Sequence, residues 1–338
     1  MRKKVSLKDI AKQSGTSTAL VSYVLNGKLT DKINPATSHR IKQLAQQLNY
    51  YPNQVAKSLK NSKTLMLGLI VADISNLYSS TIARVIEDAA RVHGYNVLFS
   101  SADENPEKFS ELVQVYMNRQ VDGIILACPK DVEQKLQYLE EQRIPFVMID
   151  RYFPDLKGMN SVTINNYKAS YNVVTHLIKK GYKNPAMITL SSKLHHLQDR
   201  VSGFEDAVIR LLNQEKAKVV AVEENMLAEE MESVIIKLCK DKSAIDALYF
   251  STNKIAIEGL SVLVRHCIAV PEEVAVVCFD EVDAYKLFHK SITHVKQPLD
   301  KIGSKVVELV LDRINNSADA QQIVLDAILI EGESSKRL

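Results

Sequence analysis

Short apolar runs alternate with helix-patterned stretches over most of this chain, and they do so in two successive series. The first series runs from MLGLIVADI (66–74) to PFVMID (145–150), and the second runs from NPAMITLSS (184–192) to VAVVCFD (274–280). Strands that alternate with helices form parallel sheets covered by helices, so the alternation predicts a doubly wound α/β fold. Two series in one chain predict two similar lobes.

The end of the chain is expected to return to both lobes. SITHVKQP (291–298) and IVLDAILIEG (323–332) are apolar runs on either side of a helix predicted near 299–315. A ligand of such a pair of lobes is expected in the crevice between them, outside the carboxyl ends of the strands. We therefore place lobe one at about 64–162 and 294–322, and lobe two at about 163–293 and 323–338.

The charge of the chain is divided unequally. Residues 1–62 hold eleven Lys or Arg against Asp9 and Asp31, which gives +9, so the remaining residues must carry −6 to reach the net +3 of the whole chain. Such asymmetry indicates a basic module that binds a polyanion, joined to an acidic domain. A solvated basic tail is the alternative, but this segment is patterned for folding.

The first fifty residues carry the signals of three short helices. Ser6 followed by Asp9 resembles a capping box and predicts the start of a first helix. Gly15 is expected to form the turn, because it tolerates the left-handed backbone of a sharp reversal. Ser17 can then cap a second helix, and Pro35 is expected to open the third. The residues expected to face the core are Leu20, Val21, Val24 and Leu25 of the second helix and Ile41, Leu44, Ala45 and Leu48 of the third.

Two short helices joined by a tight glycine turn and closed by a third form a helix-turn-helix unit. In that motif the second helix enters the major groove, and its first residues contact base edges. Lys and Arg around it would supply the part of the affinity that does not depend on sequence. Spacing alone leaves a generic three-helix bundle as an alternative. We divide the chain into a helix-turn-helix headpiece (1–50), a hinge segment (51–63) and a two-lobed domain (64–338).

SLKDIAKQSGTSTALVSYVLNGK (6–28) resembles the headpiece of the LacI-GalR family of bacterial transcription regulators, and YYPNQVAKSL (50–59) is similar to the hinge of that family. The base-reading positions that the resemblance implies are Thr18, Ala19, Ser22 and Tyr23, with Ser6, Asn26 and Asn53 nearer the DNA backbone. The chain departs from the family at 20–23, where Thr-Val-Ser-Arg is common and this sequence has Leu-Val-Ser-Tyr. The missing Arg is a guanine reader worth about 1–3 kcal/mol of discrimination. The preferred operator therefore cannot be copied from the family.

The segment NQVAKSLKN (53–61) is too short to be a stable helix alone, since isolated helices below ~12–15 residues are marginal. We expect it to fold only when it is paired with its twin and with DNA, as an order–disorder switch. The resemblance implies that Leu59 wedges into the minor groove and that Lys60 follows it there. A plain linker is the alternative.

The rest of the chain resembles periplasmic sugar-binding proteins and the effector domain of the same family. The similar segments are DISNLY, VMIDR, DRVSGF, STNK, CFDE and VKQP, together with the loop ahead of Arg200. The effector-binding residues that they imply are Asn76, Tyr78, Asp150, Arg151, His196, Arg200, Asn253, Asp280 and Gln297. Carboxylates and amides share hydrogen bonds with hydroxyl groups and Arg donates a rigid fork, so this set suits a sugar or sugar derivative.

Two positions make the charge of that ligand an open question. Lys254 stands where the family often has Asp, and His195 and His196 precede Arg200 in a loop that varies with ligand. If these side chains face the crevice, they favour an acidic or phosphorylated sugar, because each adds positive potential. If they are exposed or structural, they do not indicate the charge of the ligand.

Several function classes lack support in the sequence. There is no GxGxxG, Walker A loop, GxSxG or paired His–Glu spacing, so we expect no catalytic residue, metal or cofactor. The apolar stretches are far shorter than the ~18 residues of a membrane span, and the basic start MRKKVSLKD has no apolar segment behind it. The four cysteines, Cys128, Cys239, Cys267 and Cys278, form no CxxC and are expected to be buried, reduced thiols. These features favour the cytoplasm.

The sequence thus predicts a homodimeric, DNA-binding transcription regulator, and we favour a repressor. Two headpieces would read a pseudo-palindromic operator, because the two-fold symmetry of the protein is mirrored in the half-sites. A sugar-like effector bound between the lobes would change the operator affinity. The alternative is a sugar-binding receptor with no DNA function. The basic headpiece disfavours it.

Overall fold

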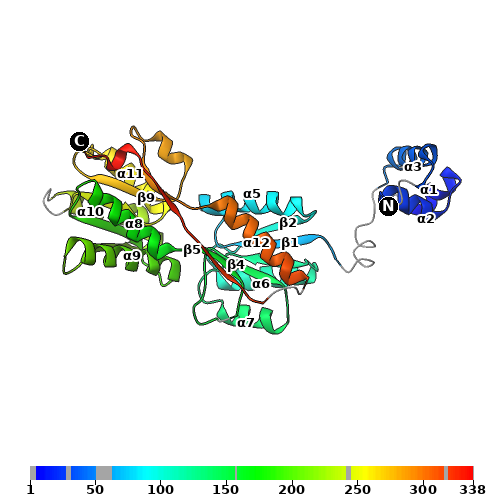
Figure 1. The fold of residues 1–338 in the computed structure, drawn as a ribbon, viewed down its shortest axis with the longest axis horizontal. Helices are drawn as coiled ribbons and strands as arrows, with labels where there is room; N and C mark the ends of the chain where they lie inside the picture. Colours follow the sequence, from blue (N-terminus) through cyan, green and yellow to red (C-terminus); the bar gives the residue numbers. More distant parts are fainter. Residues whose placement is uncertain are drawn as a thin grey trace. The chain divides into compact units, whose positions relative to one another are not determined.

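The computed structural model describes residues 5–27, 32–50, 63–156, 158–240, 245–315 and 319–337. The chain divides into two compact units, Met1–Thr64 and Leu65–Leu338 (Figure 1). The smaller unit holds helices α1 (Leu7–Ser14), α2 (Thr18–Leu25) and α3 (Pro35–Gln47), which pack against one another. The three helices predicted for the headpiece are therefore confirmed.

The ends of these helices are set by local chemistry. The side chain of Ser6 accepts a hydrogen bond from the backbone of Asp9, and the Asp9 side chain accepts one from the Ser6 backbone, which completes the capping box. Gly15 has a φ of +65° and Ser17 accepts from the backbone of Leu20. All three expectations are confirmed, because caps and turns depend on residues only a few positions apart.

The headpiece buries a small core. Its buried apolar residues are Ile10, Ala11, Val21, Val24, Ile41 and Ala45. The inward row predicted for α2 is right at Val21 and Val24, whereas Leu20 and Leu25 are only partly buried. An eight-residue helix packed on two others can bury one narrow stripe, so flanking positions stay half open.

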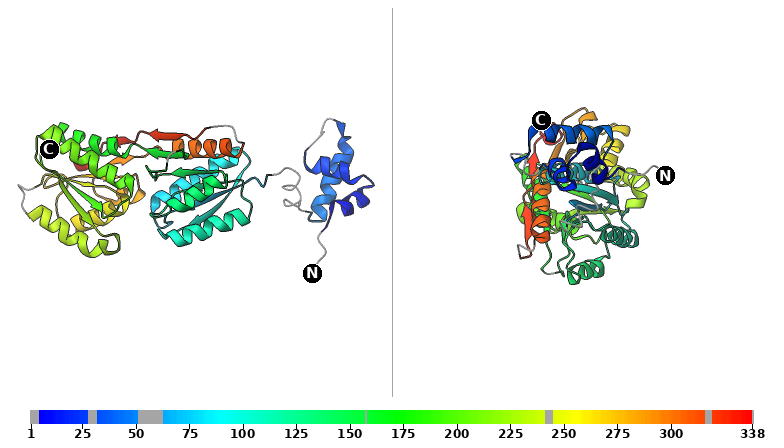
Figure 2. Two further views of the ribbon diagram at one scale, coloured as in Figure 1. Left: turned by 90° about the horizontal axis from the view of Figure 1, so that it is seen from below. Right: turned by 90° about the vertical axis from the view of Figure 1, so that its right-hand side faces the viewer.

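The larger unit contains two six-stranded sheets (Figures 1 and 2). The first sheet has the order β11-β5-β4-β3-β1-β2, and all its pairs are parallel. Its strands are β1 (Met66–Val71), β2 (Asn96–Ser101), β3 (Gly123–Leu126), β4 (Phe146–Ile149), β5 (Ser161–Ile164) and β11 (Gln322–Leu325). The helices of this lobe are α5 (Leu77–Val92), α6 (Pro106–Asn118), α7 (Glu133–Glu141) and α12 (Leu299–Ile314).

The second sheet has the order β12-β10-β9-β8-β6-β7 and is parallel except where β12 runs antiparallel to β10. Its strands are β6 (Pro185–Leu190), β7 (Lys218–Val222), β8 (Ala247–Phe250), β9 (Ala275–Phe279), β10 (Thr293–Lys296) and β12 (Ile328–Ile330). The helices of this lobe are α8 (Asn166–Lys179), α9 (His195–Leu212), α10 (Leu227–Lys240) and α11 (Asn253–Arg265), with short 3₁₀ turns at Glu224–Met226, Asp283–Leu287 and Glu333–Ser335. Two doubly wound lobes are present, as predicted.

The chain crosses between the lobes three times, after β5, after β10 and after β11, and the late segments run along both lobes in Figure 2. The expected return at 294–322 is wrong at both ends. Thr293–Lys296 pairs with β9 in the second sheet, and Gln322–Leu325 pairs with β5 in the first. An apolar run shows that a strand forms, but the sheet that it joins depends on partners distant in sequence.

The central strands are buried on both faces because helices cover each sheet. Every residue of β3, β4, β8 and β9 is buried, whereas three of the edge strands, β2, β11 and β12, have no buried residue and the fourth, β7, has one. This burial explains why the central strands read as continuous apolar runs.

The cysteines only partly match expectation. All four are free thiols, and Cys128 and Cys278 are buried, but Cys239 is half-buried and Cys267 is exposed. Cys267 follows α11 with a φ of +53°, in a surface turn that leaves its side chain uncovered. In the part of the chain that the structure describes, no helix is long and apolar enough to cross a membrane.

Candidate functional site

Polar side chains gather where strands of both lobes end. Asp150 follows β4 of the first lobe and Asp280 follows β9 of the second, and each has a φ of +67°. Asn76 caps α5, and Asn253 is the first residue of α11. Helix starts and strand ends meet at the same edge of a parallel sheet, so these positions bring the two sets of side chains to one crevice.

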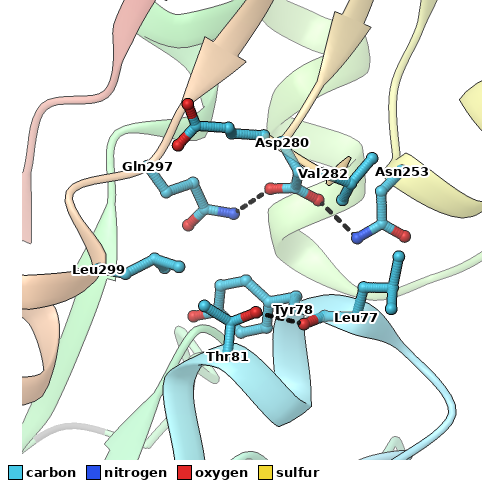
Figure 3. A pocket seen from close by; sticks show the side chains of 9 residues that line it. Leu77, Tyr78, Thr81, Asn253, Asp280, Val282, Gln297 and Leu299 are labelled. Atoms are coloured by element: carbon cyan, nitrogen blue, oxygen red, sulfur yellow. Dashed lines mark hydrogen bonds between the residues drawn. The ribbon is translucent and has the colours of Figure 1, made fainter. Parts of the chain in front are cut away.

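Tyr78 lies at the centre of this crevice, because it lines two adjoining cavities. One cavity is bordered by Asn253, Asp280 and Gln297 (Figure 3). The other is bordered by Asn76, Glu104, Asp150 and Arg151. Tyr78 therefore contacts space on both sides of the junction between the lobes.

A chain of hydrogen bonds connects the lobes next to Tyr78. The Nδ2 of Asn253 donates to Oδ1 of Asn76 at 3.0 Å and to Oδ2 of Asp280 at 3.0 Å. The Nε2 of Gln297 donates to the other Asp280 oxygen at 2.7 Å, as Figure 3 shows. Asp280 is thus held by two amides, and one of them reaches across to the first lobe.

Arg200 is 3% exposed and is held by three neighbours from its own lobe. Its Nε donates to Oδ1 of Asn166 at 2.8 Å, and its Nη1 donates to the carbonyl of Ser251 at 2.7 Å. The guanidinium lies 3.5 Å from the centre of the Phe279 ring. This fixed position suits a donor that must meet a ligand without reorganising.

Arg151 is held in the first lobe by a carboxylate fork. Its Nη1 and Nη2 donate to the two oxygens of Glu104 at 2.8 and 2.5 Å, and Nη1 also donates to the carbonyl of Cys128 at 2.9 Å. Its Nε lies 3.8 Å from Oδ2 of Asp150. Bidentate pairing with Glu104 neutralises most of the charge that Arg151 would otherwise offer to a ligand.

Burial perturbs the ionisable groups of the crevice. Burial raises the pKa of Asp150 and of Asp280, while the charge of Arg200 opposes the rise at both. The pKa of His196 lies well below its usual value, first because the ring is buried and then because Arg151 and Arg200 repel its charged form. His196 is therefore neutral near pH 7.

Three buried polar atoms of the crevice have no hydrogen-bond partner among the described residues. They are the hydroxyl of Tyr78, the Nε of Arg151 and the Nδ1 of His196. Buried polar groups are nearly always paired, so unpaired ones that surround a cavity indicate where a polar ligand would bind. Seven of the nine predicted effector residues line one of the two cavities, namely Asn76, Tyr78, Asp150, Arg151, Asn253, Asp280 and Gln297. Arg200 and His196 are buried and line neither cavity, and their role toward a ligand stays a prediction.

Two contributors were missed by the sequence reasoning. Glu104 follows β2 and holds Arg151, whereas Asn166 begins α8 after β5 and holds Arg200. The hydroxyl of Tyr152 also donates a hydrogen bond to Oδ2 of Asp199 at 2.8 Å, a contact that was not predicted either. The position of Glu104 after an apolar run is a signal that could have found it, but β5, with the sequence SVTI, has only two apolar residues and gives no such signal for Asn166.

The charges around the crevice do not match the conditions for an acidic ligand. The Nζ of Lys254 lies 2.8 Å from Oε1 of Glu224, and both side chains are nearly half exposed. His195 is half-buried, with its ring 5.8 Å from that of Tyr152. Neither residue adds an unpaired positive charge to the cavities around Tyr78.

The predicted DNA-contact residues of the headpiece differ in their exposure to solvent. Thr18, Ala19 and Tyr23 are exposed on α2, and Ser22 is half-buried beside them. The Nδ2 of Asn26 donates to the carbonyl of Ser22 at 2.7 Å. Ser6 is exposed, with its hydroxyl 2.7 Å from Asp9. Asn53, Leu59 and Lys60 lie outside the described residues.

Two family models match this chain. Residues 64–331 match the model described as periplasmic binding proteins and sugar binding domain of LacI family, and residues 6–53 match the model described as bacterial regulatory proteins, lacI family. Together they cover the headpiece and the two-lobed unit.

Curated relatives and solved structures agree with these matches. The chain is 30% identical to the HTH-type transcriptional regulator KdgR of Bacillus subtilis (strain 168), over 99% of this chain and 100% of that protein. It is 31% identical to the HTH-type transcriptional regulator RegA of Clostridium acetobutylicum, over 98% of this chain and 99% of that protein. The fold is similar to that of the Lac repressor dimer bound to operator and the anti-inducer ONPF, with a TM-score of 0.84, 20% identity, and coverage of 98% of this chain and 99% of that one.

Proposed function

This chain belongs to the LacI family of bacterial regulatory proteins and is a DNA-binding transcriptional regulator. From that premise we propose a separate function for each of its two units. The headpiece binds an operator. A small ligand bound around Tyr78, between the lobes of the larger unit, changes the affinity of the headpiece for that operator. The ligand is a sugar or a sugar derivative.

The observation that carries this proposal is the convergence of polar side chains from both lobes on one crevice. Asp150 and Arg151 come from the first lobe, Arg200 and Asp280 from the second, and the Asn76–Asn253 hydrogen bond joins the two at 3.0 Å. A ligand that bridges these groups stabilises one relative position of the lobes over another. Differential stabilisation of two arrangements is what allows a ligand to change a distant affinity.

The formal charges of the crevice favour an uncharged sugar over an acidic or phosphorylated one. Glu104, Asp150 and Asp280 outnumber Arg151 and Arg200, and His196 is neutral. Carboxylates accept hydrogen bonds from sugar hydroxyls, whereas a ligand phosphate beside Asp150 would be repelled. We propose a neutral polyhydroxylated effector.

We propose that the protein acts as a homodimeric repressor in the cytoplasm, on a pseudo-palindromic operator. The two-fold symmetry of a dimer pairs two headpieces with two half-sites. The fold similarity to the Lac repressor dimer supports this assembly. Dimers and tetramers are distinguished by sedimentation of the full chain.

The proposal is tested with the purified full chain in two measurements. Thermal shift with a panel of neutral sugars, sugar acids and sugar phosphates should identify a neutral ligand that raises the melting temperature. Operator affinity and ligand affinity should then change by the same factor, because coupling between two binding sites is reciprocal. Protein that shows no salt-sensitive retention of any duplex, with or without sugars, would contradict the proposal.

A receptor that binds sugar and ignores DNA is the competing function. The match of residues 6–53 to the regulatory headpiece speaks against it. The two functions differ in one readout: a receptor gives a sugar-induced thermal shift that duplex DNA leaves unchanged.

A further inference from the structure

The exposed face of α2 carries no charged side chain. The eight residues of the helix, TALVSYVL, include no Asp, Glu, Lys, Arg or His. Thr18 and Ala19 are exposed at its first turn, and Tyr23 is 41% exposed one turn later. The helix that a helix-turn-helix unit inserts into the major groove therefore offers methyl groups, a hydroxyl and a phenol.

The amide of Asn26, at the end of α2, is already engaged. Asn26 caps the end of α2, where its Nδ2 donates to the carbonyl of Ser22 at 2.7 Å and reaches the Ser22 hydroxyl at 3.3 Å. An Asn that reads adenine needs both its amide groups for the base. Asn26 would have to give up its cap to do so.

The cations of the described headpiece lie on other elements. Lys8 and Lys12 are exposed on α1, and Arg40 and Lys42 are exposed on α3. Cations on flanking elements can contact phosphates, which strengthens binding to any sequence. Among the described residues of the headpiece, contact with base edges in the major groove therefore falls to the uncharged side chains of α2.

The base-edge code gives the methyl groups of this face one direct partner. Guanine is read by Arg or Lys, adenine by Asn or Gln, and cytosine by Glu or Asp, and a Ser or Thr hydroxyl can pair with several bases, whereas methyl groups contact the thymine methyl. We propose that Ala19 and Thr18 of α2 select the half-site by packing their methyl groups against thymine methyls. This inference rests on the DNA-binding function proposed above and names the base chemistry that it uses.

The test begins with selection of binding sites from random duplexes by the full chain. Each thymine of the selected half-site is then replaced by deoxyuridine, which keeps the hydrogen-bonding edge and removes the methyl. We expect roughly a fourfold loss of affinity at one or two thymines, the factor that corresponds to ~0.8 kcal/mol for one buried carbon. Replacement of guanines by 7-deazaguanine, which lacks the N7 acceptor, should have no comparable effect.

Variants assign the contact to residues. Thr18→Ser removes a methyl and keeps the hydroxyl, and Ala19→Gly removes the other methyl. Each variant should bind thymine and deoxyuridine equally at one position while it keeps its discrimination at the other. Ala36→Gly on α3, where Ala36 is also exposed, is the matched control for the helix cost of glycine and should keep the full deoxyuridine penalty.

The outcomes distinguish a failure of the thymine-methyl proposal from a failure of the DNA-binding function. A selected operator that tolerates deoxyuridine but loses affinity with 7-deazaguanine would overturn the inference and leave the regulator intact. A deoxyuridine penalty that persists unchanged in both Thr18→Ser and Ala19→Gly would overturn the assignment to these residues. If no sequence is enriched and no duplex is retained, the DNA-binding function itself fails.

Discussion

Arg200 joins several elements of the second lobe. The motif DRVSGF predicted it only as a donor toward a ligand, but the structure shows two hydrogen bonds to Asn166 and Ser251 and a ring contact with Phe279. A buried guanidinium that ties α8, α9 and the end of β8 together contributes to stability even when no ligand is present.

We expect Arg200→Ala to lower the free energy of unfolding by about 3–5 kcal/mol, because it leaves buried partners and the Asp280 charge uncompensated. Arg200→Lys should lose less, since it keeps the charge but not the fork. Urea unfolding of the full chain measures both. The control is Arg91→Ala, whose side chain is 76% exposed, and a loss at Arg200 no larger than at Arg91 would contradict the prediction.

His196 should make stability depend on pH. Its pKa is well below 6.5 in the folded protein, so the folded state binds fewer protons than the unfolded state in the interval between the two values. Its contribution to stability is then complete above about pH 6.5 and falls as the pH decreases below that value. The urea midpoint should fall more steeply on acidification in the wild type than in His196→Gln.

The comparison with His196→Gln is needed because burial also lowers the pKa of His176, which would give a slope of the same sign. The pH dependence of the urea midpoint that remains in the variant is due to His176 and other groups. Equal slopes in the wild type and the variant would show that folding does not lower the pKa of His196.

Residue identity in the crevice could be predicted only where a segment resembles the family. Asp150 lies in VMIDR and Asp280 in CFDE, whereas Asn166 lies outside the similar segments and follows a strand, SVTI, in which apolar residues alternate with Ser and Thr. The partner of each Arg could not be predicted either. Glu104 and Arg151 are 47 positions apart, and only the folded sheet brings them within 2.8 Å.

At the scale of elements, helices α8 and α9 pack unusually close at Gly203. A Cβ built on Gly203 would lie 2.1 Å from the carbonyl oxygen of Tyr167, which belongs to the backbone of α8 and cannot rotate away. The sequence motif indicated this glycine but gave no reason for it. The reason is the contact between two helices, both of which also supply a side chain to the Arg200–Asn166 pair.

Gly203→Ala should therefore destabilise the two-lobed unit by about 1–3 kcal/mol, because the helices must separate to admit a methyl group. Ser202→Ala, at an exposed neighbouring position on the same helix, should change stability by less than about 0.5 kcal/mol. Thermal and urea unfolding check both variants. Equal stabilities of the two variants would mean that α8 can move away from Gly203 at no cost in free energy.

Helices and their caps could be predicted more fully than sheets. Ser6, Gly15 and Ser17 act through neighbours three or four positions away, so the sequence contains what is needed. The placement of β10 and β11 in opposite sheets from those expected depends on pairing with β9 and β5, and no local pattern encodes that choice.

At the scale of the whole molecule, the unequal charge of the two units should set the response to salt. Residues 1–62 carry +9 and the rest −6. If the headpieces neutralise about 6–10 phosphates, affinity for DNA should fall by roughly 10³–10⁵ between about 50 and 200 mM salt. Fluorescence anisotropy with a labelled duplex measures the slope.

Variants identify the charges responsible. Lys12→Gln and Arg40→Gln should make the logarithmic slope shallower, because each removes a cation from the headpiece. Lys286→Gln, which removes an exposed cation from the larger unit, should leave the slope unchanged. A slope that responds equally to all three would contradict the assignment of DNA binding to the headpiece.

The three crossings between the lobes also govern the order in which this protein can be made. Helix α12 covers β3, β4 and β5 of the first lobe, yet its codons follow those of nearly the entire second lobe. A nascent chain that has emerged through β9 still leaves the apolar surface that Val306 and Val310 will bury open to water, and the sheet still lacks β11. During synthesis the headpiece thus emerges first and the first lobe emerges without α12 and β11. That lobe can be completed only when these last elements have been made.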